Sequence, residues 1–311
     1  MILRIFNPSH DECLASGSPY YTPSRTARQM DEVHLPGWHC LSDDLPSWQD
    51  VERVEPWGWD ARITHQLRRR GCPECLLPSA ERLDTIRQFS SRQTAVRLLP
   101  MVTDKFKSWY LPLPPPPKGG ERRCTLKTLD ELSPFGGVGG GRGSLLFKSP
   151  WSCSGRGVFT YDEQRIQKVM REQGGIEVEP FYPRVADFAM EFRCQGGEVE
   201  FLGLSAMLNG GASTHVAGYG GNIVASDTTI RKLMTRYVPE KEVNEARDKL
   251  LNVLRREIAP HYDGPLGIDQ MIVSLTPDDN APSAYALHPL VEINLRHTMG
   301  LVAIEMRDAL L

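Results

Sequence analysis

An apolar segment near the C-terminus carries polar side chains at positions where a buried strand normally has none. The segment LVEINL (290–295) places Glu292 and Asn294 two residues apart. Alternate residues of a strand share a face, so both side chains point the same way. Burying a carboxylate and an amide side by side is costly unless something pairs with them. The pattern therefore predicts a strand that is built around a polar site.

The preceding apolar segment, GIDQMI, supplies a second carboxylate, Asp269. We expect strands over 268–275 and 285–295, and in an antiparallel pair Asp269 would lie beside Glu292 and Asn294. Two carboxylates and an amide oxygen form a hard-oxygen ligand set that suits Mg²⁺, which can also bridge nucleotide phosphates. The alternative is a buried hydrogen-bond network without metal, and the spacing alone does not choose between the two.

A lysine ends a short apolar segment in the middle of the chain, and a loop of small residues follows it. SLLFK (144–148) predicts a strand that delivers Lys148, and Ser152, Ser154 and Gly155 lie in the loop. Backbone N–H groups of such a loop can approach phosphates closely, and a lysine ammonium suits phosphate oxygens. The segment is not a P-loop, because the chain has no Gly-x₄-Gly-Lys-Ser/Thr string, and no GxGxxG occurs either.

A third segment, GIEVEPFY (175–182), mixes apolar and polar residues and runs toward Asp187. By itself it predicts a strand followed by a bend. The following segment, 187–194, alternates, with Phe188 and three further apolar side chains on one face. We expect it to pair with 199–203 as an antiparallel neighbour across the turn QGGE.

Several other stretches show the periodicity of buried elements. The first six residues form an apolar run that suits a buried strand. Thr160 and Glu163 have the spacing of a capping box. We expect helices over 23–35, from Ser79 to about Leu99, from the capping box to about Gln173, and over 240–258.

The composition is that of an ordinary globular protein, with 40% hydrophobic and 24% charged residues. The formal net charge is −3, so no basic excess favours nucleic acid or an anionic membrane as a partner. No run approaches the ~18 uninterrupted apolar residues of a membrane span. The seven cysteines are odd in number and irregularly spaced, which predicts free thiols in a reducing cytoplasm.

The three polar signals follow one another in a fixed order. Lys148 and its loop come first, the acidic strand lies about 30 residues further on, and Asp269 and the Glu-x-Asn pair follow. In this order and spacing the sequence resembles the ATP-grasp superfamily, with a layout most like that of D-alanine–D-alanine ligases. The resemblance covers residues 90–311 by motif, whereas residues 1–89 match by position and length only.

The resemblance implies a fold and a division into domains. The expected fold class is α+β: an ATP-grasp fold, in which two α+β lobes grip ATP, preceded by an N-terminal α/β domain. The implied domains are 1–89 for the N-terminal pre-ATP-grasp domain, 90–177 for the lobe with the lysine and the glycine-rich loop, and 178–311 for the lobe with the hinge and the metal site.

The resemblance also implies roles for individual residues, with ATP and Mg²⁺ as cofactors and Mn²⁺ as a substitute. Glu292 would bridge the metal ions, and Arg296 matches a position where family members often place an anion-binding group. The implied nucleotide-binding residues are Lys148, Ser152, Ser154 and Gly155 on the strand and phosphate loop, Glu179, Pro180, Phe181 and Tyr182 on the adenine hinge, and Asp187 at the ribose. The implied metal ligands are Asp269, Glu292 and Asn294.

The sequence departs from the family pattern at one position. A family arginine that stabilises the acyl-phosphate transition state commonly stands two residues before the metal-binding Asp, where this chain has Gly267. Arg193 and Arg296 are the candidate catalytic replacements. A further basic residue should reach the phosphates from the helix that precedes Lys148, and Arg92 and Arg97 are both available.

The implied function is ATP- and Mg²⁺-dependent ligation of a small-molecule carboxylate to an amine or similar nucleophile. The reaction would pass through an acyl phosphate and release ADP and phosphate. Two alternatives stay open, a kinase on the same scaffold and a non-catalytic nucleotide-binding module, and Gly267 makes the second plausible. The sequence indicates neither the substrates nor the oligomeric state.

Three further features have both a functional and a structural interpretation. The glycine-rich stretch 209–222 is typical of loops that line substrate pockets, and Tyr219 and Asn222 are its strongest candidates for substrate contact. Cys72 and Cys75 form a lone CxxC, which lacks the further ligands of a zinc site. A histidine could deprotonate an amine nucleophile, although a structural role is the commoner one; the candidates are His215, His288 and His297.

Overall fold

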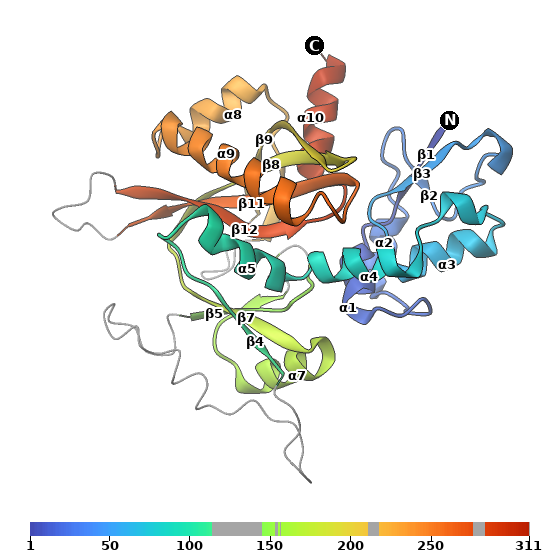
Figure 1. Cartoon of the computed structure of the whole chain (residues 1–311), viewed down its shortest axis with the longest axis horizontal. Coiled ribbons are helices and arrows are strands. Elements are labelled where there is room, and N and C mark those ends of the chain that lie inside the picture. The colour runs from blue at the N-terminus through green and yellow to red at the C-terminus, as the bar shows by residue number, and fades with distance from the viewer. Residues whose placement is uncertain (114–144, 153–154, 156, 211–217, 276–283, 311) are drawn as a thin grey trace, which may run out of the picture.

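The computed structural model describes most of the chain and contains three β-sheets (Figure 1). An N-terminal sheet with its helices lies at one end of the molecule, and the other two sheets lie one above the other. The described residues are 1–113, 145–152, 155, 157–210, 218–275 and 284–310. Residues 114–144 and 211–217, the latter within the glycine-rich stretch 209–222, fall outside these ranges.

The N-terminal sheet is parallel and has the strand order β2-β1-β3. Leu3 and Ile5 of its central strand are fully buried, which confirms the expected strand at the start of the chain. The predicted helix over 23–35 forms only over a shorter range. The elements are β1 (Ile2–Phe6), α1 (His10–Ser16), α2 (Arg25–Asp31), β2 (His39–Cys40), β3 (Arg53–Pro56) and α3 (Ala61–Arg69), with 3₁₀ turns at Trp48–Asp50 and Glu74–Leu76.

The single helix expected from Ser79 to Leu99 is wrong, because two helices occupy this range. Helix α4 (Ala80–Phe89) begins at the Ser79 cap as expected, and α5 (Arg92–Val102) begins at a second cap, Ser91. The hydroxyl of Ser91 accepts a hydrogen bond from the backbone N–H of Gln93. Serine side chains compete in this way for helix N–H groups and start a new helix.

The second sheet is antiparallel, with the order β4-β7-β5-β6, and α7 packs against it. The expected helix there is confirmed, but its cap is Asp162 and not Thr160. The carboxylate of Asp162 accepts from the backbone N–H of Arg165, so the capping-box assignment was wrong by two residues. The elements are β4 (Trp109–Pro112), β5 (Leu145–Lys148), β6 (Val158–Phe159), α7 (Glu163–Gln173) and β7 (Gly175–Pro180).

The third sheet has five antiparallel strands in the order β10-β9-β8-β11-β12. It confirms the strand pairing expected across the turn QGGE and between the two C-terminal strands. The predicted domain boundaries at residues 89 and 177 stay predictions. The elements are β8 (Arg184–Gln195), β9 (Glu198–Gly210), β10 (Gly218–Asn222), α8 (Asp227–Met234), α9 (Glu240–Glu257), β11 (Gly264–Ser274), β12 (Tyr285–Asn294) and α10 (Met299–Leu310).

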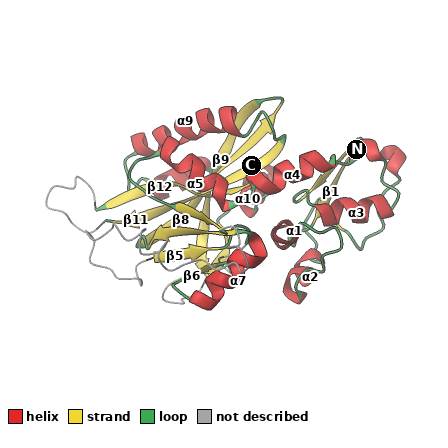
Figure 2. Ribbon diagram, turned by 60° about the horizontal axis from the view of Figure 1, so that its bottom comes forward, coloured by secondary structure: helices red, strands yellow, loops and turns green. Residues whose placement is uncertain are grey.

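Strand alternation gives the five-stranded sheet two different faces. Phe188, Met190 and Phe192 point to one face and are buried in the main core, under helices α5 and α9. Figure 2 shows α9 running along this side of the sheet. The odd-numbered residues of β8 point to the opposite face, which looks toward the four-stranded sheet. Helix α10 crosses the end of the sheet, where it packs on β9.

An aromatic cluster joins the N-terminal sheet to α10. The rings of Trp38 and Trp57 pack on each other and on Phe6, and Val302 of α10 closes the cluster. The ring of His297 lies against both tryptophans, and its backbone N–H donates to the carbonyl of Trp57 at 2.7 Å. These contacts fix the N-terminal sheet beside the end of β12.

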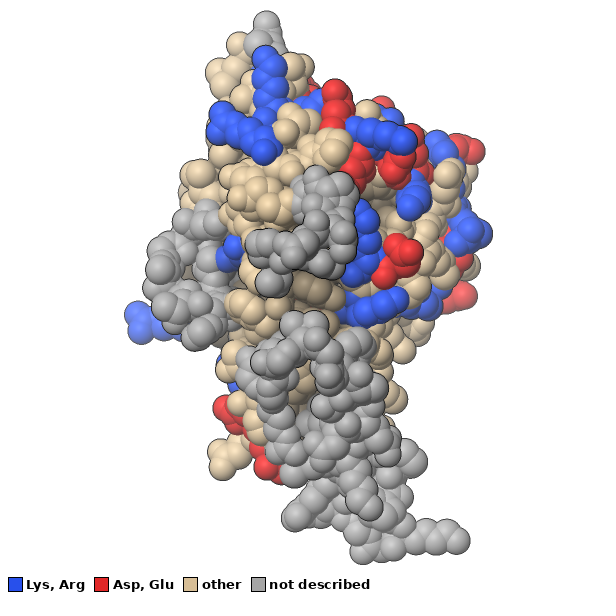
Figure 3. Space-filling model, turned by 90° about the vertical axis from the view of Figure 1, so that its left-hand side faces the viewer, with Lys and Arg blue, Asp and Glu red and all other residues tan. Residues whose placement is uncertain are grey.

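The surface carries charges of both signs. On the face shown in Figure 3, Lys and Arg side chains lie interspersed with Asp and Glu. Within the described residues, no helix combines the length and the apolar character needed to cross a bilayer.

His288 gives the fold a testable pH dependence. Its ring is 1% exposed and packs on Phe106 and Tyr182, and within the described residues neither ring nitrogen has a hydrogen-bond partner. Burial lowers the pKa of His288 to about 3, and the nearby ammonium of Lys148 acts in the same direction. The unfolded chain therefore binds a proton below pH ~6.5 that the folded chain does not bind until about pH 3.

We expect the wild type to lose up to about 1.4 kcal/mol of unfolding free energy per pH unit below pH ~6.5, relative to His288→Leu. Urea unfolding at pH 7.5, 6.0 and 5.0 measures this difference. The control variant is His34→Gln, at an exposed histidine, which should follow the wild type. Identical pH slopes for the wild type and His288→Leu would contradict the assignment.

Candidate active-site cleft

A cleft of about 540 Å³ lies where the three sheets meet. Its size is in the range of small-molecule sites. The N-terminal sheet and helix α1 contribute Phe6, Asp11 and Trp57, and the other two sheets contribute most of the residues expected at the site. Those expected residues are Lys148, Ser152, Gly155, Glu179, Phe181, Tyr182, Asp187, Asp269, Glu292, Asn294 and Arg296.

Two expected residues lie outside the lining, and one lies outside the described residues. Within the described chain, Pro180 and Arg193 do not line the cleft. Arg193 pairs in register with Pro265, near the end of β8, beyond the last residues of this strand that face the cleft. The geometry therefore gives Arg193 no contact with a ligand in the cleft. Ser154 is the one outside the described residues.

The pairing of β11 with β12 brings the three expected metal ligands together. Asp269 lies directly opposite Glu292, and Gly267 lies opposite Asn294, so all three polar side chains share the face that lines the cleft. Burial raises the pKa of the Asp269 carboxyl, and the charges of Glu292 and Glu191 raise it further. Two carboxylates and an amide oxygen, held together at this electrostatic cost, are a donor set that fits Mg²⁺.

Asp269, Glu292 and Asn294 together form an oxygen cage. Arg92 connects this cage to the loop that follows Lys148. Its guanidinium is buried and donates to Glu292 Oε2 at 2.7 Å, to Ser152 Oγ at 2.7 Å and to the carbonyl of Ser149 at 2.6 Å. Arg97, by contrast, is exposed and pairs with Glu257 outside the cleft. The structure thus resolves the choice that the sequence left open, and the cleft arginine is Arg92.

Lys148 lies between two buried carboxylates. The register of β5 with β7 places Lys148 opposite Glu177 and Leu146 opposite Glu179. The ammonium of Lys148 lies 2.8 Å from Glu179 Oε1 and 3.5 Å from Glu177 Oε1. Burial alone would lower the pKa of Lys148, but the two carboxylates outweigh it and raise the pKa. The lysine therefore stays charged in the cleft.

The segment that follows β7, the strand paired with β5 and Lys148, forms one wall of the cleft. Phe181 and Tyr182 line this wall, and Phe181 is 39% exposed. Asp187 follows on β8 and accepts from Arg184 at 2.7 Å. Burial raises the pKa of Asp187, and Arg184 opposes that effect.

Arg296 lies at the junction with the N-terminal sheet. Its guanidinium donates to Asp11 Oδ2 at 3.1 Å and to Asn294 Oδ1 at 3.0 Å. Helix α1 therefore reaches across to the end of β12 and orients this arginine. Tyr219 and Asn222 also line the cleft, from the strand β10, and the hydroxyl of Tyr219 donates to Asn222 Oδ1.

The position expected to hold a family arginine is packed against a carboxylate that sequence reasoning missed. A Cβ built on Gly267 would lie 2.8 Å from Glu191 Oε2, and a Cβ on Gly300 would collide with Glu191 Oε1. Glu191 is 1% exposed yet lines the cleft. Its oxygens accept from Thr298 Oγ1 at 2.8 Å and from Ser205 Oγ at 3.2 Å.

One signal in the sequence could have identified Glu191. It is four residues after Asp187 on an alternating strand, so it lies on the same face as Asp187 and opposite the apolar face. Burial raises the pKa of Glu191 to about 7, although its two hydroxyl partners and Arg296 oppose that effect.

The described candidate histidines do not line the cleft. His288 lies beneath Tyr182 and Phe106, and His297 belongs to the tryptophan cluster with Glu305 3.5 Å away. The third candidate, His215, lies outside the described residues. Neither His288 nor His297 is therefore placed to take a proton from a bound ligand.

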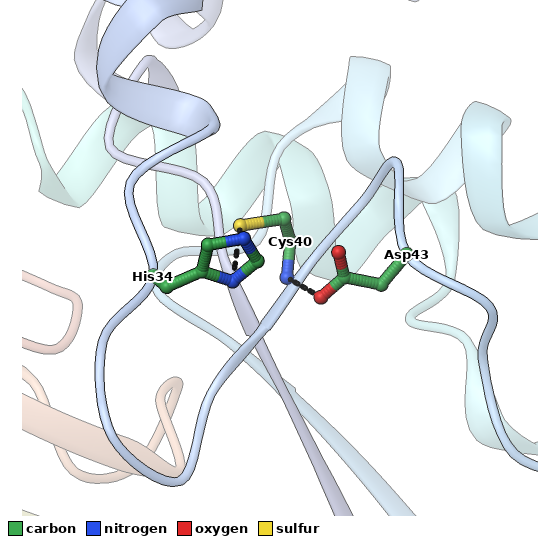
Figure 4. A group of neighbouring side chains, drawn as sticks. All are labelled: His34, Cys40 and Asp43. Carbon is green, nitrogen blue, oxygen red and sulfur yellow. Dashed lines mark hydrogen bonds between the residues drawn. The ribbon is translucent and has the colours of Figure 1, made fainter.

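Other potential metal-binding side chains lie in the N-terminal part. Figure 4 shows His34, Cys40 and Asp43, whose donor atoms all lie within 4.8 Å of one another. Asp43 Oδ2 already accepts from the backbone N–H of Cys40, and the thiol lies 3.7 Å from His34 Nδ1. Cys72 and Cys75 are free thiols, and Cys72 is buried in the core of the N-terminal sheet.

Comparison with known proteins supports the fold. No family model and no curated protein sequence matches the chain. Among solved structures, D-alanyl-alanine synthetase A from Vibrio cholerae superposes with a TM-score of 0.51 at 12% identity, over 98% of this chain and 92% of that chain. The chain has an ATP-grasp fold.

Two further ATP-grasp structures show weaker similarity. N5-carboxyaminoimidazole synthetase from Staphylococcus aureus, complexed with ADP, gives a TM-score of 0.49 at 13% identity, over 98% of this chain and 73% of that one. D-cycloserine synthetase gives 0.47 at 11% identity, over 100% and 98%. The superposition on D-alanyl-alanine synthetase A confirms the α+β class and the ATP-grasp fold expected from the sequence.

The contact between Gly300 and Glu191 generates a prediction about stability. Alanine normally stabilises a helix relative to glycine by about 0.5–1 kcal/mol. In α10 the added methyl group of Gly300→Ala would collide with the Glu191 carboxylate and Ser205 Oγ. We therefore expect Gly300→Ala to lower the free energy of unfolding by about 1–3 kcal/mol.

A double-mutant cycle checks this prediction by chemical unfolding. Because Glu191→Ala removes the carboxylate, Gly300→Ala should cost less in that background than in the wild type. Strictly additive effects, or a stabilising effect of Gly300→Ala alone, would show that the two residues are not in contact.

Proposed function

We propose that the protein is an ATP- and Mg²⁺-dependent ligase that joins a carboxylate to an amine through an acyl phosphate. The observation that carries this proposal is the placement of Asp269, Glu292 and Asn294 in one cleft with Lys148 and Arg92. An oxygen cage beside two buried cations is suited to a polyphosphate that is held together with a divalent ion.

Each cation has a separate part in this proposal. Lys148, held by Glu177 and Glu179, binds phosphate oxygens of the nucleotide. Arg92 reaches the phosphates from the other side and keeps Glu292 oriented toward the cleft. Phe181, Tyr182 and Asp187 line the same cleft. In this proposal the two aromatic residues form the wall for the adenine and Asp187 contacts the ribose.

The cage Asp269, Glu292 and Asn294 would hold Mg²⁺, which neutralises phosphate charge during phosphoryl transfer. The γ-phosphoryl group passes to an oxygen of the substrate carboxylate, and ADP leaves. The amine nitrogen then attacks the carbonyl carbon, the C–O bond to phosphate breaks, and the displaced proton goes to solvent. Arg296 is the catalytic residue that we assign to the anionic carboxylate and acyl phosphate, because it is the cation beside the cage on the N-terminal side.

The central prediction concerns the cage. Glu292→Gln removes a metal-binding charge and the ionic partner of Arg92, so we expect ATP-dependent phosphate release to fall below about 1% of the wild-type rate. The assay follows phosphate and ADP with purified protein, ATP, Mg²⁺ and pairs of carboxylates and amines. Glu172→Gln, on the exposed side of α7, is the matched control and should keep the wild-type rate.

The products distinguish the proposal from its alternatives. A ligase releases ADP and free phosphate in equal amounts, whereas a kinase leaves the phosphoryl group on the product. Tight Mg²⁺-dependent ATP binding without ADP formation would favour a nucleotide-binding module. Full activity of Glu292→Gln would show that the metal site is assigned to the wrong residues.

A further inference from the structure

Glu191, like Asp269, lines the cleft without a Lys, Arg or His of the described residues at ion-pair distance. The cleft-lining cations of the described chain are each paired within 4.0 Å: Arg92 with Glu292, Lys148 with Glu179, Arg184 with Asp187, and Arg296 with Asp11. In the same described residues, no Lys, Arg or His lies within 4.0 Å of the Glu191 carboxylate.

Two hydroxyl groups hold this carboxylate in place. The hydroxyl oxygen of Thr298 accepts from the backbone N–H of Leu301, so its own proton is directed to Glu191 Oε2. Ser205 donates to the other oxygen, Oε1. Both partners are neutral donors, and each carboxylate oxygen keeps a lone pair for a further donor.

Two glycines make room for the carboxylate at the wall of the cleft. Side chains at Gly267 or Gly300 would occupy the space that Glu191 now fills, and Tyr219, Asp269 and Arg296 line the cleft nearby. A buried carboxylate without a cation is costly, and its charge is compensated best by a cation that binds beside it. Asp269 and Glu292 are the ligands of the proposed metal ion, so that ion does not account for Glu191.

We propose that Glu191 forms a binding subsite for the protonated amino group of the nucleophile, so that the cleft takes a primary ammonium compound and discriminates against its hydroxyl analogue. This inference rests on the proposed ligase function and names the class of its second substrate. The ammonium donates to Glu191, whose orientation is fixed by Ser205 and Thr298. One proton passes from the ammonium to the Glu191 carboxylate before attack, because the nitrogen needs a free lone pair to bond to the carbonyl carbon. A hydroxyl group carries no charge and leaves the buried carboxylate uncompensated.

The test compares the wild type with Glu191→Gln, which keeps the size of the side chain but removes its charge. The probes are amino acids and their 2-hydroxy acid counterparts, such as alanine and lactate, titrated by calorimetry into protein saturated with MgADP. For the wild type we expect binding of at least one amino acid and at least tenfold weaker binding of its hydroxy analogue. In Glu191→Gln the amino acid should bind about 10- to 100-fold more weakly.

Two further variants separate the lost charge from a disturbed fold. Ser205→Ala removes one hydrogen bond to the carboxylate and keeps the charge, so it should weaken amino acid binding less than Glu191→Gln does. Glu172→Gln removes an exposed carboxylate on α7 and should bind the amino acid as the wild type does. MgADP affinity within twofold of wild type shows that each variant is folded.

The outcomes distinguish this subsite from the nucleotide site. If MgADP binds but no amine binds, or if Glu191→Gln binds the amine as tightly as the wild type, the ammonium subsite is wrong and the ATP site stands. If a hydroxy acid binds as tightly as its amino acid, the charge of Glu191 does not select the substrate. If MgADP itself does not bind, the proposed function fails first and the subsite fails with it.

Discussion

The antiparallel register of β11 and β12 is the constraint on which the cleft depends. It places Asp269 opposite Glu292 and Gly267 opposite Asn294, so three polar groups meet on one face while their neighbours Ile268 and Ile293 enter the core. A slip of one residue would exchange these faces, burying the carboxylates in the apolar core. The core therefore enforces the register, and the register assembles the polar cage.

Arg92 links these polar groups to a loop of the four-stranded sheet. One buried guanidinium binds Glu292 of the five-stranded sheet and the carbonyl and hydroxyl groups of the loop that follows Lys148. Removing either partner would leave a buried charge uncompensated, which is far more costly than losing an exposed ion pair. The two sheets are thus coupled through charges at the same place where a nucleotide would bind.

The excess of carboxylates over cationic side chains explains why the cleft suits a ligand that binds together with a metal ion or carries a positive charge. The described lining residues include seven carboxylate and four cationic side chains. Burial raises the pKa of both Asp269 and Glu191, and the charge of Glu191 raises the pKa of Asp269 further, so keeping both groups ionised in the folded chain is costly. A divalent ion at the cage and an ammonium at Glu191 would relieve this cost in different parts of one cleft.

The sequence was sufficient for features that depend on local periodicity. The strand alternation and the neighbouring positions of Asp269 and Glu292 followed from a two-residue repeat. The ATP-grasp fold, by contrast, was implied by a resemblance in the order and spacing of the motifs. The sequence did not distinguish Arg92 from Arg97 as the cleft arginine. The helix breaks at Ser91, and the start of α5 there determines which of its side chains face the cleft.

Contacts between residues that are far apart in the chain could not be predicted from the sequence either. Arg296 is oriented by Asp11, 285 residues away in the sequence, and no local sequence pattern predicts that pairing. Strand alternation places Glu191 on the polar face of β8, but its contacts with the glycines of β11 and α10 exist only in the folded chain.

The most direct measurement is a crystal structure of the protein with Mn²⁺ and a non-hydrolysable ATP analogue, with anomalous data that locate the metal. The account predicts a manganese peak bonded to Asp269, Glu292 and Asn294, with the triphosphate between this ion and Lys148. An anomalous peak elsewhere, or a nucleotide whose phosphates lie away from both Lys148 and the cage, would contradict it.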